Sequence, residues 1–334
     1  MRVSVNAKRL RPPGAIAAVA GLAVLAGCGG SDDGRSSGAA AVPTQSSPTQ
    51  VRVSYVPATT VLPLHVAKEQ GYFAKSGLDV SLKEASNISD IPATLGRQFD
   101  IALGTATDLI RAGGAGVDVV QMAGNTIDTK SNPFVQLMVK KNSGIKSVAD
   151  LQGKRVGTPT LGGVIHAAVL YSAKQHNAEH SKVQGVEAPS PTLPDQLKAG
   201  RIDAVEALEP FATTLKRKGA LSLGDPFAAI GQPLATNFWI ANGAWARENP
   251  AVVQRYVAAL EQAVTFIEDN PKEARRILQG YTNMPPKIAN VVPLPTWDFG
   301  IRTQDLDKWV DVLKDVGHFK GDVDAQKLVL TDAR

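Results

Sequence analysis

The chain has 334 residues, of which 43% are hydrophobic, and a formal charge of +5 at pH 7. Four of its 36 lysines and arginines lie in the first eleven residues, so the rest of the chain carries 32 cations against 31 acids and is nearly neutral. This balance excludes the strongly basic surface of a typical nucleic-acid-binding protein.

The first 27 residues have the pattern of a secretory signal peptide. Cations stand at positions 2, 8, 9 and 11 without any acid, and residues 15–26 form an unbroken apolar run that ends in small residues. As a helix this run would rise about 18 Å, which is short of a hydrocarbon core of about 30 Å. The pattern therefore predicts a segment that is removed, not a permanent membrane span.

The single cysteine, Cys28, directly follows Leu25-Ala26-Gly27. This tetrapeptide resembles the lipobox of bacterial lipoproteins, which implies that the Cys28 sulfur is acylated, that the chain is cut before it, and that the protein is anchored to the extracytoplasmic face of the membrane. The alternative is an ordinary signal peptide with a cysteine there by chance. Residues 28–50 are rich in Gly, Ser, Ala and Pro, and we expect a flexible tether that spans roughly 25 Å.

Residues 51–122 alternate between β-branched runs and helix-forming stretches. The run at 51–56 predicts a strand, after which Pro63 begins a helix that Gly71 ends. Further strands are expected at 79–85, 100–103 and 117–122, with helices at 91–96 and 108–112. Such alternation predicts an α/β fold in which helices cover a mostly parallel sheet.

A second alternating series of similar plan follows, and the chain then returns to the first. Its expected strands are 134–139, 155–157, 183–188 and 202–207, and its expected helices are 164–173, 195–199 and 211–216. The returning strand 238–241 leads to Asn249-Pro250, read as a helix cap, and to a long helix with residues 253, 257, 260, 264 and 267 on its apolar face; a last helix is expected at 306–316. We therefore predict two lobes, 51–136 with 238–334 and 137–237, joined by two hinge strands near 134–140 and 235–241, with the binding site in the cleft between them.

A Gly-Arg turn precedes a strand in both series. Gly96-Arg97 is followed by Asp100, and Gly200-Arg201 by Asp203. Since these turns lie at the N-terminal ends of strands, away from the usual ligand edge, we expect both arginines to be solvated.

Several short motifs carry a family resemblance through their order and spacing. They are AKEQGYF at 67–73, GLDV at 77–80, the two Gly-Arg turns, SVADLQGKRVG at 147–157, EPF at 209–211, NP at 249–250 and NPKEA at 270–274. In this order, residues 51–334 resemble the type II solute-binding proteins of ABC importers, in the nitrate/sulfonate/taurine and thiamine-pyrimidine group.

The resemblance implies a two-lobed periplasmic-binding-protein fold and a monomer that captures a small organic solute and delivers it to an ABC permease and its ATPase. The solute could be sulfonate-like, taurine-like or aminopyrimidine-like. The resemblance implies neither catalysis nor a cofactor. Two alternatives stay open: a lipoprotein that senses a solute for a signalling partner, and an enzyme like the related thiamine-pyrimidine synthase, which uses a cysteine-rich motif that this chain lacks.

Ligands of open α/β sheets lie beyond the carboxyl ends of the strands, near helix N-termini. The loops there point to a ligand-binding set that consists of Thr59, Thr60, Thr105, Thr160, Gly162, Gly163, Glu209 and Asn237. Gly162 and Gly163 precede a helix, so their amides are expected to approach an oxygen-rich head; the alternative is a plain helix-initiating turn. The loops are 57–60, 104–107, 158–163 and 206–211. Because the first three contain no Lys or Arg and the fourth carries Glu209, the simplest anions are disfavoured.

Glu209 and Asn237 have competing interpretations. Glu209 could accept from a ligand amine, or could cap the helix that follows Pro210. On the returning strand, Asn237 and Trp239 alternate with Phe238, so one pair can line the cleft while the aromatic residues can equally pack in the core.

The histidines give little sign of catalysis or metal binding. His176 and His180 have helical i,i+4 spacing but polar surroundings, and we expect no metal site. His65 and His166 lie near expected helix starts, where packing is favoured over a ligand contact.

Overall fold

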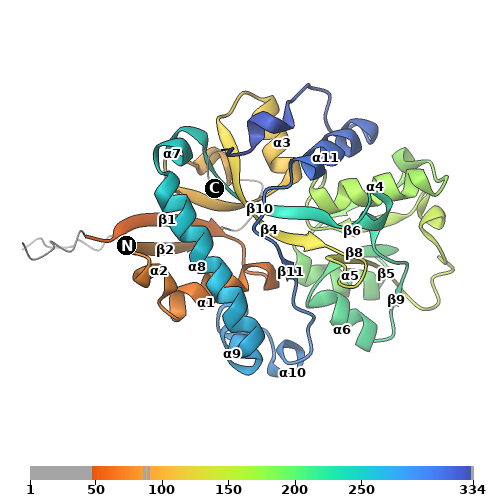
Figure 1. Ribbon diagram of the computed structural model, residues 1–334. Coiled ribbons are helices and arrows are strands. Elements are labelled where there is room, and N and C mark those ends of the chain that lie inside the picture. Colours follow the sequence, from red (N-terminus) through yellow and green to blue (C-terminus); the bar gives the residue numbers. More distant parts are fainter. Residues whose placement is uncertain (1–46, 86–87, 89–90, 332–334) are drawn as a thin grey trace, which may run out of the picture. The chain divides into compact units, whose positions relative to one another are not determined.

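The computed structural model of the protein describes residues 47–85, 88 and 91–331 (Figure 1). The predicted signal peptide, Cys28 and most of the predicted tether lie outside these residues. The tether was expected to reach residue 50, but strand β1 already begins at Thr49, and Thr49 and Gln50 pair with Leu78 and Asp79. None of the described helices combines the length and the hydropathy that a membrane-spanning helix needs.

The first sheet has six strands in the order β11-β4-β10-β3-β1-β2. They are β1 (Thr49–Tyr55), β2 (Leu78–Glu84), β3 (Ile101–Thr105), β4 (Val119–Asp128), β10 (Leu234–Asn242) and β11 (Thr296–Trp297). Strands β1, β2 and β3 are parallel, and β10 runs antiparallel between β3 and β4. The antiparallel direction arises because β10 is the strand on which the chain returns from the other sheet.

The second sheet has five strands in the order β7-β6-β8-β5-β9. They are β5 (Val135–Val139), β6 (Arg155–Thr158), β7 (Gln184–Glu187), β8 (Ala204–Leu208) and β9 (Leu221–Ser222). Strands β6, β7 and β8 are parallel, while β5 is antiparallel to both β8 and β9. The predicted α/β class is confirmed, with both sheets mixed.

The chain passes between the sheets twice. The first connection, residues 129–134, joins β4 to β5, and the second, residues 223–233, joins β9 to β10 (Figure 1). The predicted lobe boundaries at 136/137 and 237/238 fall a few residues inside β5 and β10.

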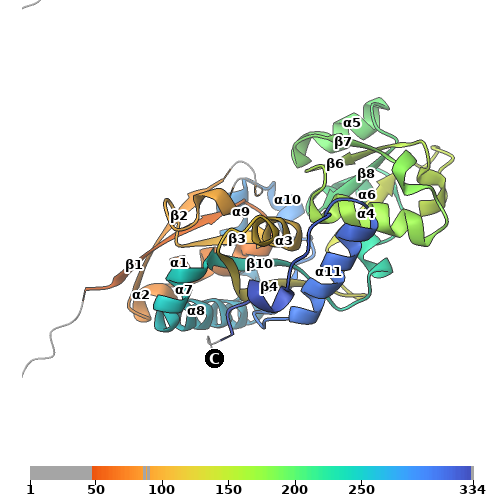
Figure 2. The same cartoon turned by 90° about the horizontal axis from the view of Figure 1, so that it is seen from above.

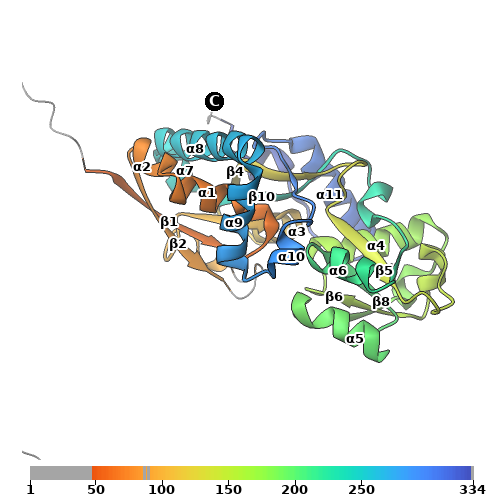
Figure 3. The same ribbon diagram turned by 90° about the horizontal axis from the view of Figure 1, so that it is seen from below.

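The helices cover the faces of the sheets. They are α1 (Leu62–Glu69), α2 (Tyr72–Lys75), α3 (Ala106–Gly114), α4 (Val164–Gln175), α5 (Leu193–Ala199), α6 (Phe211–Arg217), α7 (Gly243–Glu248), α8 (Pro250–Asp269), α9 (Pro271–Thr282), α10 (Pro286–Ala289) and α11 (Thr303–Asp315). Helix α8 packs along α1, as Figure 3 shows from below. Helix α11 contacts both α3 and α4 and lies between them in Figure 2, so it bridges helices that belong to different sheets.

One local expectation was wrong, since the helix expected at 91–96 is only a short 3-10 turn, Pro92–Thr94. Asn249 is the N-cap of α8 and Pro250 follows it, as expected, but the cap makes no side-chain hydrogen bond, and Asn249 Nδ2 donates to the carbonyl of Trp245 at 2.9 Å. On the expected apolar face of α8, residues 253, 260 and 267 are buried, and Val257 and Val264 are partly buried. Tyr256 is buried as well, and its ring meets that of Trp239 at 5.5 Å.

The Gly-Arg turns of the two sheets have the same architecture. Asp100 accepts from the backbone amide, Nε and Nη2 of Arg52, and Asp203 accepts from the same three groups of Arg155. Arg97 and Arg201 are exposed, as predicted. Each aspartate ties the start of one parallel strand to the turn before the next, which repeats one local design in both sheets.

Candidate functional site

The predicted site residues of the first sheet gather at the carboxyl ends of β1 and β3. Asn237 lies opposite Thr105 in the ladder between β10 and β3. Its Oδ1 accepts from Asn125 Nδ2 at 2.9 Å and from Thr126 Oγ1 at 2.8 Å. Asn125 Nδ2 also donates to the carbonyl of Thr60 at 3.3 Å. All five residues are buried, so the structure joins Thr60, Thr105 and Asn237 in one polar region.

Aromatic side chains brace the loop that carries Thr59 and Thr60. Trp297 Nε1 donates to the carbonyl of Thr60 at 3.0 Å, and the Tyr281 hydroxyl donates to that of Ala58 at 2.8 Å. The ring of His65 stacks on Tyr281 with centroids 3.7 Å apart, and burial lowers the pKa of His65 to about 4. His65 is therefore a neutral packing residue behind the loop, the interpretation that the sequence favoured.

Thr105 forms the N-cap of α3. Its hydroxyl donates to Asp108 Oδ2 at 2.6 Å and accepts from the Asp108 amide at 3.4 Å. This cap satisfies one of the amides that a helix start leaves without an intrahelical partner.

The loop before α4 uses the two amides that were expected to bind a ligand. The Gly162 amide donates to His166 Nδ1 at 3.0 Å, and the Gly163 amide donates to the carbonyl of Thr160 at 3.1 Å. Gly162 has a φ of +71°, which favours glycine. Gly163 is the N-cap of α4 and has no capping side chain. The amides left for an acceptor are therefore those of the first turn of α4, not those of Gly162 and Gly163.

Arg111 on α3 contacts this loop. The sequence did not suggest this contact, because Arg111 lies far from the loop along the chain. An ideal Cβ built on Gly162 would lie 2.7 Å from Arg111 Nη2, so the guanidinium packs directly against the glycine. Arg111 is partly buried and forms no ion pair within the described part of the chain. The loops after β3 and β6 thus share a cation that neither loop contains. Inspecting the helix after each loop, as well as the loop itself, could have suggested it.

Two neutral imidazoles line the same region. The rings of His166 and His318 stack with centroids 5.4 Å apart. Burial, assisted by His318, lowers the pKa of His166 to about 4, and burial followed by the charge of Arg111 lowers the pKa of His318. Arg111 is thus the only one of the three that carries a charge at neutral pH.

Glu209 caps α6, the second of its two predicted roles. Its Oε2 accepts from the Thr213 amide at 3.0 Å, and burial raises its pKa. The sequence did not single out Glu206 on β8, which is 1% exposed and whose carboxyl oxygens meet no hydrogen-bond partner among the described residues. Burial raises the pKa of Glu206 to about 8, so that this carboxyl is largely neutral at pH 7.

His176 and His180 do not share a helix. Helix α4 ends at Gln175, and His176 Nδ1 lies 2.7 Å from the carbonyl of Ser172, one turn back. Within residues 47–85, 88 and 91–331, no three His, Cys, Asp or Glu side chains are grouped so as to hold a metal ion.

A family model described as NMT1/THI5 like matches residues 58–274, more than half of the chain. The chain belongs to the NMT1/THI5-like family.

Known proteins similar to this family member include both enzymes and binding proteins. Over 252 residues, 71% of each chain, it is 24% identical to the 4-amino-5-hydroxymethyl-2-methylpyrimidine phosphate synthase THI11 of Saccharomyces cerevisiae. Over 328 residues, 91% of this chain and 93% of the other, it is 24% identical to a Bacillus subtilis relative whose name gives aliphatic sulfonates as its provisional ligand. The crystal structure of the periplasmic aliphatic sulphonate binding protein SsuA of Escherichia coli matches with a TM-score of 0.73 at 20% identity, covering 85% of this chain and 93% of that one. The predicted two-lobed periplasmic-binding-protein fold is thereby confirmed.

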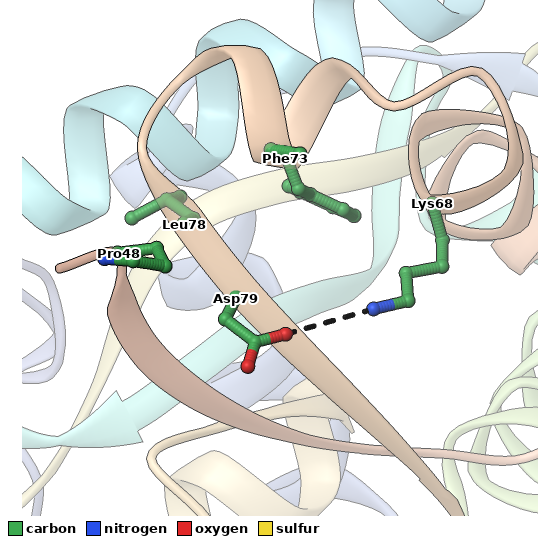
Figure 4. Close-up of a pocket in the computed structure, with 6 residues that line it drawn as sticks. Pro48, Lys68, Phe73, Leu78 and Asp79 are labelled. Atoms are coloured by element: carbon green, nitrogen blue, oxygen red, sulfur yellow. Dashed lines mark ion pairs between the residues drawn. The ribbon is translucent and has the colours of Figure 1, made fainter.

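A surface pocket of about 220 Å³ lies away from the predicted site (Figure 4). Its lining includes Pro48, Phe73 and Leu78, together with Lys68 and Asp79, whose charged groups are 3.9 Å apart. Pro48 and Leu78 stand at the N-terminal starts of β1 and β2, whereas ligands of this fold class bind beyond the carboxyl ends. We therefore do not assign the solute site to this pocket.

Proposed function

We propose that this protein is a solute-binding protein of an ABC importer, anchored outside the cytoplasm through a lipid on Cys28, and that its solute has an anionic, sulfonate-like or carboxylate head. The observation that carries the proposal is the guanidinium of Arg111, which forms no ion pair with another described residue and lies against Gly162 at the start of α4.

Two features of this position favour an anion. The first turn of a helix carries partial positive charge and presents unpaired amides, and α4 has no side chain that caps it. A guanidinium next to such a helix start adds a full charge and two parallel donors, the arrangement that oxyanions such as sulfonate and carboxylate bind best. The sequence disfavoured the simplest anions because no cation stood in three of the loops and the fourth carried Glu209.

The acids of the surrounding elements are mostly neutral or already engaged in hydrogen bonds. Asp108, one turn before Arg111 on α3, accepts from the Thr105 hydroxyl at 2.6 Å. Glu206 is largely neutral and Glu209 is engaged by the Thr213 amide. Glu187, which is exposed, accepts from the Leu161 amide at 2.7 Å. The polar region of Thr60, Thr105 and Asn237 on the first sheet supplies neutral groups for the remainder of the solute, such as the amine of a taurine-like molecule.

The mechanism is capture without chemistry. Arg111 belongs to a helix of the first sheet and Gly162 to a loop of the second, so a solute held by both favours the closed arrangement of the two sheets. Affinity is then coupled to the closed population, which a permease can read. The chain has one cysteine, which argues against the synthase activity of the THI11 relative, because the resemblance attaches a cysteine-rich motif to that chemistry.

The test is a thermal-shift and calorimetric titration of the full-length protein in mild detergent. The panel contains an alkanesulfonate, taurine, nitrate and an aminopyrimidine. A solute at 100 times its Kd stabilises by about 2.7 kcal/mol, so a specific ligand raises Tm clearly. We expect the alkanesulfonate or taurine to bind, and Arg111→Gln to weaken that binding about 10- to 100-fold, as the loss of charged hydrogen bonds implies.

Arg97→Gln is the matched control, because Arg97 is exposed on the opposite edge of the sheet and should leave the affinity unchanged. Binding of the aminopyrimidine alone, with no effect of Arg111→Gln, would show that the head is not anionic.

Loss of the protein from the membrane fraction in Cys28→Ser tests the anchor. Uptake of the solute by cells with and without this protein distinguishes import from sensing. Loss of an importer's binding protein abolishes uptake, whereas loss of a sensor leaves uptake unchanged.

A further inference from the structure

The two connections between the sheets are joined by three side chains. Asp128 is the last residue of β4, where the first connection begins, and Asp225 and Gln232 belong to the second connection. Gln232 Nε2 donates to Asp128 Oδ2 at 2.5 Å and to Asp225 Oδ2 at 2.7 Å. The side-chain amide of Gln232 therefore hydrogen-bonds one carboxyl of each connection between the sheets.

Each carboxyl also holds the backbone of its own connection. Asp128 Oδ1 accepts from the Phe134 amide at 2.6 Å, and Asp225 Oδ1 accepts from the Phe227 amide at 2.9 Å. The shared Gln232 Nε2 brings Asp128 Oδ2 and Asp225 Oδ2 close to each other, and Asp128 is fully buried. Two carboxylates have only acceptors, so a direct hydrogen bond between them requires a proton.

Among the described residues, no cation forms an ion pair with either carboxyl of the pair. The charged and titratable groups on the elements packed around it are the exposed Lys130 of the first connection, Asp305 of α11 with its partners Arg302 and Lys308, and His166 and Lys174 of α4. Burial, followed by the charge of Asp128, raises the pKa of Asp225 to about 8. Two like charges this close titrate as a coupled pair, and the second ionisation is strongly disfavoured.

We propose that Asp128 and Asp225 share one proton, and that this proton, together with the Gln232 amide, fastens the first connection between the sheets to the second. Loss of the proton at alkaline pH leaves two carboxylates facing each other and releases the connections. The sheets then separate more easily, so the device sets the ease of opening by pH whichever solute is bound.

Hydrogen exchange of the full-length protein in detergent tests this device. Exchange of segments 129–134 and 223–233 is compared at pH 7 and pH 9 after scaling for the intrinsic pH dependence, with α8 as the internal reference. We expect protection of both segments to fall about tenfold at pH 9, since opening coupled to loss of one proton grows tenfold per pH unit above the pKa. Asp225→Asn, which keeps a neutral donor beside Asp128, should abolish this fall.

Glu206→Gln is the matched control, because Glu206 is a second buried acid with a pKa raised to about 8 but sits within the second sheet. It should leave the fall in protection unchanged. If Asp225→Asn does not fold, Asp128→Asn serves the same purpose. The proposal is overturned if wild-type protection does not depend on pH, if the dependence survives in the aspartate variant that folds, or if Glu206→Gln abolishes it.

Discussion

Gly162→Ala tests the contact between Arg111 and the start of α4, on which the proposed anion site depends. Gly162 has a φ of +71°, a conformation that costs an L-residue about 1–2 kcal/mol. The new Cβ would also lie 2.7 Å from Arg111 Nη2, so the guanidinium must move. Because Nη2 is the far end of a flexible side chain, this displacement costs little, and the destabilisation should stay near the backbone cost of about 1–2 kcal/mol.

Gly153→Ala is the control that isolates the arginine. Gly153 has a φ of +76°, and a Cβ there would meet no heavy atom within 4 Å, so only the backbone term of about 1–2 kcal/mol remains. Urea unfolding measures the stability of both variants, and calorimetric titration measures their affinity for the solute. We expect both variants to lose similar stability, and only Gly162→Ala, which displaces the guanidinium, to weaken binding, by about tenfold.

Equal affinities of the two glycine variants for the solute would refute the reasoning, since the guanidinium would then not pack against the loop. A further loss of affinity when Gly162→Ala is added to Arg111→Ala would refute it as well, because some other neighbour would be responsible.

Three further predictions concern buried titratable groups. Asp305→Ala should destabilise by about 2–4 kcal/mol in chemical denaturation, because the 2% exposed Asp305 accepts from the Ala235 amide, which would lose its partner; an effect under 1 kcal/mol would contradict this. The pKa of His65 is lowered to about 4, so its contribution to stability is complete above pH 6.5 and is lost as pH falls toward 4. His65→Phe should therefore make Tm less sensitive to acid between pH 6.5 and pH 4. An unchanged dependence of Tm on pH would argue against burial as the cause of the lowered pKa. The pKa of Glu206 is raised to about 8, so its contribution to stability is present below about pH 4.5 and is lost as pH rises to 8. Glu206→Gln should therefore gain stability relative to wild type between pH 5 and pH 8. A difference in unfolding free energy between the two proteins that does not change with pH would count against this reasoning.

The order of strands and helices could be predicted from the sequence because it depends on local patterns. Alternating β-branched residues, Pro63 at a helix start and Gly71 after its end act within a few residues, and the structure has β1 and α1 where they predict. The short turn at 92–94 was misread because the flanking Ile91 and Leu95 are buried without the residues between them completing a helix. Asn249 stands at the predicted N-cap of α8, but its side chain bonds to the preceding helix.

The candidate site was only partly within reach of the sequence. Thr60 and Thr105 follow from the rule that parallel strands end at one edge. Asn237 came from the expected returning strand, and the structure brings the three residues together. Which amides are already used could not be predicted, since the Gly162 amide depends on the position of the His166 ring. The role of Glu209 was likewise open until its distance to the Thr213 amide was known.

The sequence by itself determined the class of fold and the edge of the sheets at which a solute would bind, because hydrophobic periodicity and turn residues act locally. Only the tertiary structure decided the charge of the site and the link between the connections. Arg111 meets Gly162, and Asp128 meets Asp225, across segments far apart in the chain. Whether a carboxyl is charged, as Glu206 illustrates, depends on burial, and burial is a property of the packed chain that no local pattern contains.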